Sequence, residues 1–196
     1  MRSIPDPKNQ LSKYGCSKIL YLAPMNAKTP KESLTIMNEL VLPNDTNMLN
    51  NLMGGRLLHL MDIAAAICGQ RHSNRVVVTA SVDNVSFSQP IKMGDLVIIQ
   101  AQVSRAFNTS LEIRLDVWAE HIPSGKKVKS NEAYYTFVAV DENNRPVPVP
   151  EVRPETEEEQ NLYDGALRRR QLRLILAGKM KPDEATELKA LFVPNS

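Results

Sequence analysis

The sequence is poor in the residue types that build disulfide frameworks, metal sites and phosphate-binding loops. Only two cysteines, Cys16 and Cys68, occur in 196 residues, without the short spacing of a zinc ribbon. This usage excludes a disulfide scaffold and favours a reducing compartment, so we expect a cytoplasmic protein. The 8 glycines form no P-loop, dinucleotide fingerprint or nucleophile elbow. His59, His72 and His121 are isolated from one another and from Cys16, which disfavours a metal site and a Cys–His nucleophile pair.

The sequence also lacks a strong charge imbalance and any long apolar run. Lysine and arginine number 24 against 22 acidic residues, and this net charge of +2 gives no reason to expect nucleic acid or an anionic membrane as partner. The longest uninterrupted apolar stretch is residues 63–68, far short of a bilayer span. The hydrophobic content of 42% is nevertheless sufficient for a packed core.

Hydrophobic patterning predicts one buried helix and a set of strands. Residues 56–72 are apolar at nearly every helical angle, so we expect a helix enclosed by protein on all sides. Residues 76–82 are rich in β-branched side chains and typical of a central strand. Residues 110–122 alternate between an apolar and a polar face. The predicted strands are residues 33–42, 76–82, 96–107, 110–122 and 127–141.

Short links between the later strands favour antiparallel neighbours, so we expect an α+β fold in which a curved antiparallel sheet wraps the central helix. We divide the chain into an irregular N-terminal arm (1–32), this central domain (33–150) and a C-terminal helical extension (151–196). The extension should begin with an acidic helix from about Pro154 that ends in basic residues near Gly178, and a short second helix should follow over 182–192. The basic cluster 168–170 fits either a solvated helix end or a phosphate-binding role.

Two polar residues stand out near the predicted helix. Asp62 is a carboxylate in the middle of the apolar helix, and burying it unpaired would cost several kcal/mol. It is therefore either tied to a hydrogen-bond donor for structural reasons or faces a substrate channel as a general base. Asn47 lies in a loop rich in Asn and Asp, where turn formation or helix capping would explain it equally well.

The spacing of these residues resembles the signature of hotdog-fold acyl-CoA thioesterases, in the subgroup of the bacterial YciA enzymes and the brain acyl-CoA hydrolase. Residues 42–62 read LPNDTNMLNNLMGGRLLHLMD. Further matches are Arg71-His72, VTASVD at 78–83, Phe87, Pro90-Ile91, Gly94-Asp95, TSLEI at 109–113, AYYTFVAVD at 133–141 and PVPVP at 146–150. The resemblance covers residues 33–150, and its combined spacing is specific where no single piece would be.

The resemblance implies a hotdog fold and hydrolysis of acyl-CoA to free coenzyme A and a carboxylic acid. It also implies that the chain forms dimers and that three dimers assemble into a hexamer. In each dimer, Asn47 of one subunit would act with Asp62 of its partner. Asp62 would serve as general base or as nucleophile. The helix N-terminus at Gly54, Gly55 and Arg56 would stabilise the thioester oxygen.

Coenzyme A is part of the substrate in this reading, and no metal or other cofactor is expected. The coenzyme A contacts implied by the resemblance are Arg71, Thr109 and Ser110, and the basic cluster adds Arg168.

Two positions depart from the family pattern. Asn50 stands where the family has glycine, although asparagine tolerates a left-handed turn, and Met53 replaces the His or Phe of some relatives.

Two other functions stay open. The alternatives are a non-catalytic acyl-CoA sensor with a basic interaction tail and a hotdog dehydratase. A dehydratase would need a site histidine, and neither Asn47 nor Asp62 is replaced by one.

Overall fold

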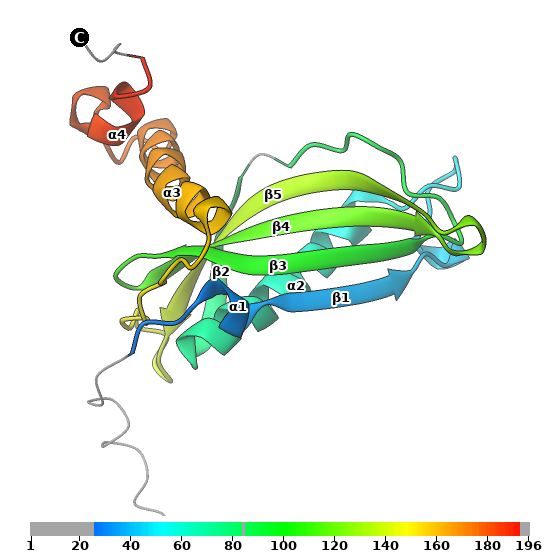
Figure 1. Cartoon of the computed structure of the whole chain (residues 1–196), viewed down its shortest axis with the longest axis horizontal. Coiled ribbons are helices and arrows are strands. Elements are labelled where there is room, and N and C mark those ends of the chain that lie inside the picture. The colour runs from blue at the N-terminus through cyan, green and yellow to red at the C-terminus, as the bar shows by residue number, and fades with distance from the viewer. Residues whose placement is uncertain (1–25, 84, 193–196) are drawn as a thin grey trace, which may run out of the picture.

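A computed structural model describes residues 26–83 and 85–192 (Figure 1). Short 3-10 turns lie at Pro43–Asp45, Ile122–Ser124 and Pro182–Glu184. The helices are α1 (Pro30–Ser33), α2 (Gly54–Ser73), α3 (Glu157–Leu176) and α4 (Thr186–Lys189). The strands are β1 (Thr35–Leu40), β2 (Val76–Asp83), β3 (Leu96–Ala106), β4 (Ser110–His121) and β5 (Lys126–Val140). Among the described residues, none of the helices has the length and apolar character that spanning a membrane would require.

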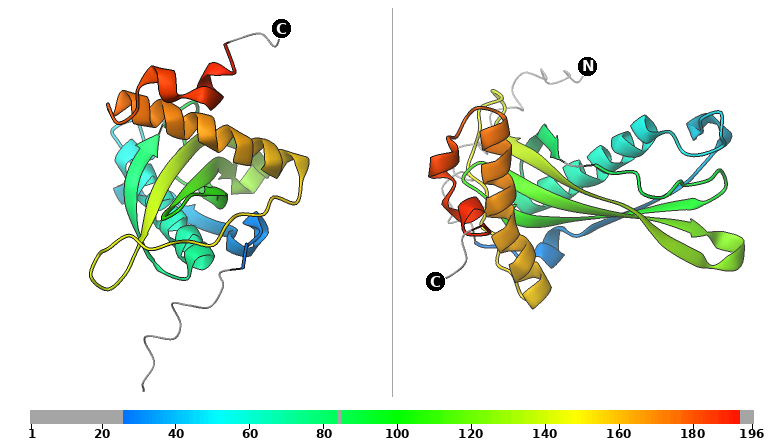
Figure 2. Two further views of the ribbon diagram at one scale, coloured as in Figure 1. Left: turned by 90° about the vertical axis from the view of Figure 1, so that its left-hand side faces the viewer. Right: turned by 90° about the horizontal axis from the view of Figure 1, so that it is seen from above.

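The five strands form one antiparallel sheet in the order β1-β3-β4-β5-β2. The sheet is strongly twisted and curls around α2, while α3 crosses the opposite face near one end of the strands (Figures 1 and 2). The predicted α+β architecture, a curved sheet around a central helix with a C-terminal helix, is therefore confirmed.

The core lies between α2 and the inner face of the sheet. The predicted alternation of β4 holds on this face, where Leu111, Ile113, Leu115 and Val117 are fully buried. The helix approaches the sheet closely at Gly69, because a Cβ there would lie 3.3 Å from side-chain atoms of Ile113 and Val77. The helix side of this core consists of Leu57, Leu60, Met61, Ala64, Ala65 and Cys68.

Two buried side chains show how little water reaches this core. Burial is the main cause that raises the pKa of the Cys68 thiol to about 12. His72 is fully buried, and its Nε2 lies 3.0 Å from the carbonyl oxygen of Pro150. Burial also lowers the pKa of this imidazole, which favours its neutral form. His59 and His121 are exposed, so His72 differs from the other two histidines in its full burial.

The β-branched strand is an edge strand, and the prediction that it is central was wrong. β2 pairs only with β5, and Val76, Val78 and Val82 are exposed. The link from β2 to β3 runs along the molecule rather than forming a hairpin, so these consecutive strands are not neighbours. β-branched side chains suit any pleated strand, and their presence does not fix the position of a strand in its sheet.

The expectation that α2 is enclosed on all sides is also wrong for the single chain. Ile63 and Ile67 on the face turned away from the sheet are 37% and 38% exposed. Exposed Ile63 and Ile67 lie beside the unpaired edge of β2, and together they form an apolar surface that no element in the described residues covers.

The C-terminal helix forms as predicted but has a role in packing that the pattern did not indicate. Its first residue follows Thr156, whose hydroxyl accepts a hydrogen bond from the Glu159 backbone in a capping box. Gly178 ends this region with a φ of 67°. Glu112, expected on the wetter face of β4, is fully buried under α3, because that helix covers this part of the outer face. The expected second helix shortens to the 3-10 turn at Pro182–Glu184 and the single turn of α4.

The N-terminal region is more regular than expected where it is described. The strand expected from residue 33 begins at Thr35, because Pro30–Ser33 form the short helix α1. Lys28 forms a bridge with Val152, which joins the start of the described chain to the segment before α3. The expectation of an irregular arm at residues 1–25, Cys16 included, lies outside the described residues.

Candidate functional site

Asp62 lies in the middle of α2 and faces β2 at the edge of the sheet. Its side chain is half-buried, and its Oδ1 accepts a hydrogen bond of 2.7 Å from the Thr79 hydroxyl. One carboxylate oxygen is thus fixed by the protein, and Oδ2 makes no hydrogen bond among the described residues. The carboxylate is tied to a donor without being sealed in the core.

Thr79 was not singled out as a site residue from the sequence. It is a hydroxyl residue directly after three valines in β2, and this interruption was the available signal. A bulge between Thr79 and Ser81 changes the pairing of β2 with β5 at this point. Bulges redirect side chains next to functional sites, so the irregularity itself marks this part of the strand.

The Tyr135 ring lies on the inner face of β5 beside this region. Its hydroxyl is buried and has no hydrogen-bond partner in the described structure. Burial is the first cause that raises the pKa of Tyr135 to about 12, and the negative charge of Asp62 adds to it. Tyr135 therefore places a buried hydroxyl group without a partner on the side of Asp62 that faces the sheet.

Asn47 lies in the loop before α2 and performs the turn role considered from the sequence. Its Oδ1 accepts hydrogen bonds from the backbone N–H groups of Leu49 (2.9 Å) and Asn51 (3.2 Å). Asn50 has a φ of 57°, so asparagine adopts the left-handed conformation where the family has glycine. The side-chain Nδ2 of Asn47 has no partner among the described residues and remains a free donor.

The N-terminus of α2 carries free backbone donors. Met53 precedes the helix and provides no side-chain cap. The first intrahelical bond runs from the Leu57 N–H to the Met53 carbonyl, which leaves the N–H groups of Gly54, Gly55 and Arg56 without partners in the described chain. The Arg56 guanidinium instead binds Asp45 at 2.8 Å and Glu39 at 3.4 Å, so its side chain fastens the preceding loop.

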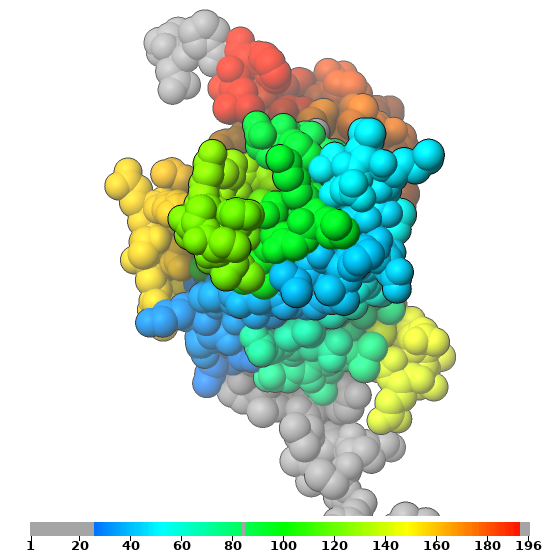
Figure 3. All heavy atoms as spheres, turned by 90° about the vertical axis from the view of Figure 1, so that its right-hand side faces the viewer, coloured from blue at the N-terminus to red at the C-terminus, as the bar shows by residue number. Residues whose placement is uncertain are grey.

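A cleft of about 350 Å³ opens beside this helix N-terminus, and its size is that of a small-molecule site. Asn47, Gly54, Leu57 and Phe87 are among its lining residues, but Asp62 is not. Gly54 and Asp62 are eight positions apart in the helix, which is about 12 Å along the axis. Figure 3 shows the end of the molecule where the loop before α2, the segment before β3 and the β4–β5 hairpin lie side by side.

The predicted coenzyme A contacts are distributed over two places. Arg71, at the end of α2, donates hydrogen bonds of 2.9 Å to the Leu34 carbonyl and the Thr35 hydroxyl. This interaction joins α2 to the start of β1. Thr109 and Ser110 form the β3–β4 turn, and the strand register places Ser110 opposite Val138, which pairs with Val78 beside Thr79.

The basic cluster in α3 is neither a solvated helix end nor a free phosphate site as a whole. Arg169 binds the buried Glu112, and Arg173 binds Asp83 at 2.6 Å. Arg170 stacks over the Phe107 ring at 4.4 Å and donates to the Ser110 hydroxyl at 3.3 Å. Arg168 is the member of this cluster for which the described structure shows no hydrogen bond or ion pair.

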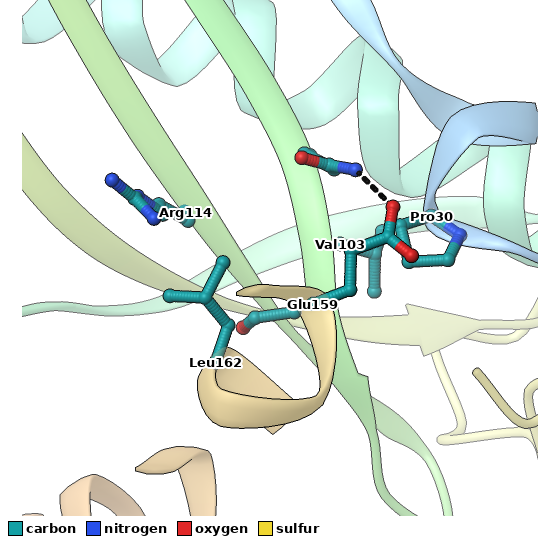
Figure 4. A pocket seen from close by; sticks show the side chains of 7 residues that line it. Pro30, Val103, Arg114, Glu159 and Leu162 are labelled. Atoms are coloured by element: carbon teal, nitrogen blue, oxygen red, sulfur yellow. Dashed lines mark hydrogen bonds between the residues drawn. The ribbon is translucent and has the colours of Figure 1, made fainter. Parts of the chain in front are cut away.

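The start of α3 packs so closely on the sheet that no ligand space remains there. Glu159 accepts a hydrogen bond of 3.1 Å from Gln102, close to Pro30, Val103 and Leu162 (Figure 4). The cavity between them measures about 10 Å³, at or below the volume that one water needs. Across the described ranges, no three His, Cys, Asp or Glu side chains gather in a group that could hold a metal ion.

Comparison with known proteins gives consistent similarities. Residues 49–126 match the Thioesterase superfamily. The acyl-CoA thioester hydrolase YkhA of Bacillus subtilis is 42% identical over 139 residues, which cover 71% of this chain and 81% of the relative. The acyl-CoA thioester hydrolase YciA of Salmonella typhimurium is 34% identical over 125 residues, which cover 62% of this chain and 93% of the relative.

Solved structures show the same similarity in three dimensions. A hexameric acyl-CoA thioesterase superposes with a TM-score of 0.76 at 38% identity, covering 78% of this chain and 97% of that one. An acyl-CoA hydrolase from Staphylococcus aureus, in complex with butyryl coenzyme A and coenzyme A, gives 0.72 at 36% identity, covering 78% and 95%. Alanine mutants of that hydrolase replace an asparagine, an aspartate or a threonine. In that hydrolase the asparagine and the aspartate are 15 positions apart, and the aspartate and the threonine are 17 apart. Asn47, Asp62 and Thr79 have the same two separations in this chain.

Proposed function

Since this chain belongs to the thioesterase superfamily and is an acyl-CoA thioester hydrolase, we propose that two of its subunits build each active site, with Asp62 from one and Asn47 from the other. The observation that carries this proposal is the separation of the parts within one chain. Asn47 and Gly54, the first residue of α2, line a cleft that excludes Asp62. Asp62 instead lies beside exposed Ile63 and the unpaired edge of β2, where a second copy would bury the apolar surface.

The chemistry follows from these groups. The backbone N–H groups of Gly54, Gly55 and Arg56 bind the thioester carbonyl oxygen, and the Nδ2 of Asn47 orients the substrate or the attacking water. Asp62, fixed by Thr79 through Oδ1, accepts the proton of a water through Oδ2 as its oxygen attacks the carbonyl carbon. The negative charge that develops on the carbonyl oxygen is stabilised by the helix amides. The C–S bond then breaks, and the coenzyme A sulfur takes the proton from Asp62, which leaves a carboxylic acid and a free thiol.

Several finer assignments belong to the same proposal. The protein forms a homo-oligomer in which dimers assemble into a hexamer, and solved relatives of the chain are hexameric. Phosphates of coenzyme A bind near the Thr109–Ser110 turn and the uncommitted guanidinium of Arg168, with Arg71 as a further contact. A reducing compartment such as the cytoplasm suits the buried thiol of Cys68.

Mixing two inactive variants tests the shared site. Asn47→Ala and Asp62→Ala subunits, each inactive alone, should regain activity when they are unfolded and refolded together at equal amounts. About half of the dimers are then mixed, and each mixed dimer has one intact site, so about a quarter of the wild-type rate should return. The measurement is release of free thiol from an acyl-CoA.

The same assay separates the alternatives. No recovery in mixed oligomers, with activity in the refolded wild type, would place both residues in one chain. Tight acyl-CoA binding without thiol release by the wild type would instead support the non-catalytic sensor. Hydration of an enoyl-CoA without thiol release would support a dehydratase.

Thr79 is a positioning residue in this proposal. Thr79→Val should lower kcat by about 10–100-fold with little change in KM, because a hydrogen bond to a charged group contributes about 1.5–3 kcal/mol. Thr79→Ser keeps the hydroxyl and should restore most of the rate. Equal rates for the valine and serine variants would show that the hydroxyl does not hold Asp62 for catalysis.

A further inference from the structure

The segment between β2 and β3 is held in place by two buried polar side chains of β5. In the strand register Asn131 faces Val117 and Lys129 faces Trp118, so Ser130 is the extra residue of a β-bulge. Ser130 and Asn131 are both 2% exposed. A bulge with two buried polar residues in an otherwise regular strand indicates that their side chains have a specific task.

That task is to fix residues 86–91, here called the strap. The Ser130 hydroxyl donates a hydrogen bond of 2.8 Å to the Gln89 carbonyl, and the Asn131 side-chain N–H donates to the Ser86 carbonyl. The Ile91 carbonyl accepts a hydrogen bond of 2.8 Å from the Leu52 backbone, which joins the strap to the loop before α2. The strap is thus fastened at both ends although it contains no helix or strand.

The strap holds the Phe87 ring against the N-terminus of α2. A Cβ on Gly54 would lie 3.2 Å from the Cζ of Phe87, so the tip of the ring lies on the backbone of this glycine. The ring is 55% exposed and does not belong to the core. An exposed aromatic ring that is fixed against the proposed thioester-binding amides stands where it can limit a bound substrate.

The cleft beside Phe87 offers apolar surface that an acyl chain can contact. Its apolar lining consists of the buried Leu57 and Ile91 together with Leu52 and Pro90, and polar side chains, mostly amides, add to its lining. Building on the proposed function, a thioester carbon at the amides of Gly54 directs its hydrocarbon chain into this cleft. The geometry points to Phe87 as the residue that sets the upper limit of acyl-chain length.

The test is a comparison of kcat/KM over saturated acyl-CoA substrates from butyryl to palmitoyl. Phe87→Ala should move the preferred chain to a longer one and raise the ratio of long-chain to short-chain kcat/KM about tenfold or more, the scale of discrimination by apolar pockets. Phe87→Trp should move the preference to shorter chains. Ile122→Ala is the matched control, because Ile122 is similarly exposed at 52% and does not line the cleft, so its profile should equal that of the wild type.

The outcomes separate this inference from the proposed function. If the wild type is active but Phe87→Ala and Phe87→Trp keep its chain-length profile, the limit lies elsewhere and the inference is overturned while the function stands. A uniform loss for all chain lengths would also overturn it, because it would assign Phe87 a general role. If the wild type cleaves no acyl-CoA of any length, both the function and the inference fail. Because Phe87 is exposed, we expect both variants to fold, and thermal unfolding measures this, with Phe87→Leu as the milder replacement.

Discussion

Replacing Asp62 with asparagine is expected to lower kcat for acyl-CoA hydrolysis by about 10²–10⁴-fold, the contribution of a well-placed general base. Asparagine has nearly the same shape and keeps an oxygen that can accept the hydrogen bond from Thr79. It cannot, however, take a proton from water. KM should change little, because the amides proposed to bind the substrate lie at the N-terminus of α2 and Asp62 lies in the middle of the helix. Steady-state thiol release over a range of substrate concentrations gives both constants.

Asp164→Asn is the control for this change. Asp164 is an exposed residue of α3 whose carboxylate accepts hydrogen bonds only from Gln160 in the described structure. Its replacement removes the same charge and should leave kcat unchanged. An Asp62→Asn enzyme that retains most of the wild-type kcat would contradict the assignment of Asp62 as the proton acceptor.

Replacing Arg169 with alanine is expected to lower the free energy of unfolding by about 3–5 kcal/mol. The Arg169 Nη2 lies 2.7 Å from Glu112 Oε1, and its Nε contacts both carboxylate oxygens. Glu112 is fully buried, and without Arg169 its remaining side-chain donor is the Ser104 hydroxyl at 2.6 Å. The guanidinium also stacks 3.9 Å from the centre of the Tyr134 ring, and this contact would be lost too. Denaturant unfolding followed by circular dichroism measures the change.

Two comparisons show whether the loss comes from the buried charge. Arg168→Ala removes an arginine from the preceding position, which has no partner in the described structure, and should change stability by about 0.5 kcal/mol or less. A double variant with Glu112→Gln and Arg169→Ala should be less destabilised than Arg169→Ala alone, because no charge is then left buried. If both arginine variants unfold at the same denaturant concentration, the Glu112–Arg169 pair does not fasten α3 to the sheet.

The fold was predictable where a pattern is local and not where it depends on distant packing. The period of two in β4 and the apolar run of α2 specify these elements directly. Glu112 follows the same alternating pattern as the other polar residues of β4, so the pattern does not indicate its burial. That burial depends on α3, whose Arg169 lies 57 positions later in the chain. The sequence likewise does not show which arginine of the cluster 168–170 forms an ion pair, because this depends on how α3 crosses the sheet.

The position of β2 shows a second kind of limit. Its valines predict a strand, but a β-branched residue is compatible with the interior of a sheet and with an edge that a second subunit covers. In the proposed two-subunit site, Ile63 and Ile67 on α2 would be buried by the partner in the same way. A single sequence records that these residues are apolar without recording whether they lie in the interior or on the surface of one chain.

The candidate site was predictable only in part. Asp62 is recognisable because a carboxylate interrupts an apolar helix, whereas Asn47 gained significance from its spacing within the family signature. Thr79 belongs to the matched segment 78–83 but was overlooked as a site residue, because its contact with Asp62 depends on how β2 lies against α2. The position of Phe87 over Gly54 likewise depends on a bulge in a strand more than 40 residues away.

The deep burial of Cys68 has a consequence for an enzyme whose product is a thiol. Each turnover releases free coenzyme A, and oxidised coenzyme A can exchange with accessible protein thiolates to form mixed disulfides. Cys68 has no exposed surface, and a pKa of about 12 leaves almost none of it as the reactive thiolate at neutral pH. This sulfur is therefore protected from forming a mixed disulfide with oxidised coenzyme A.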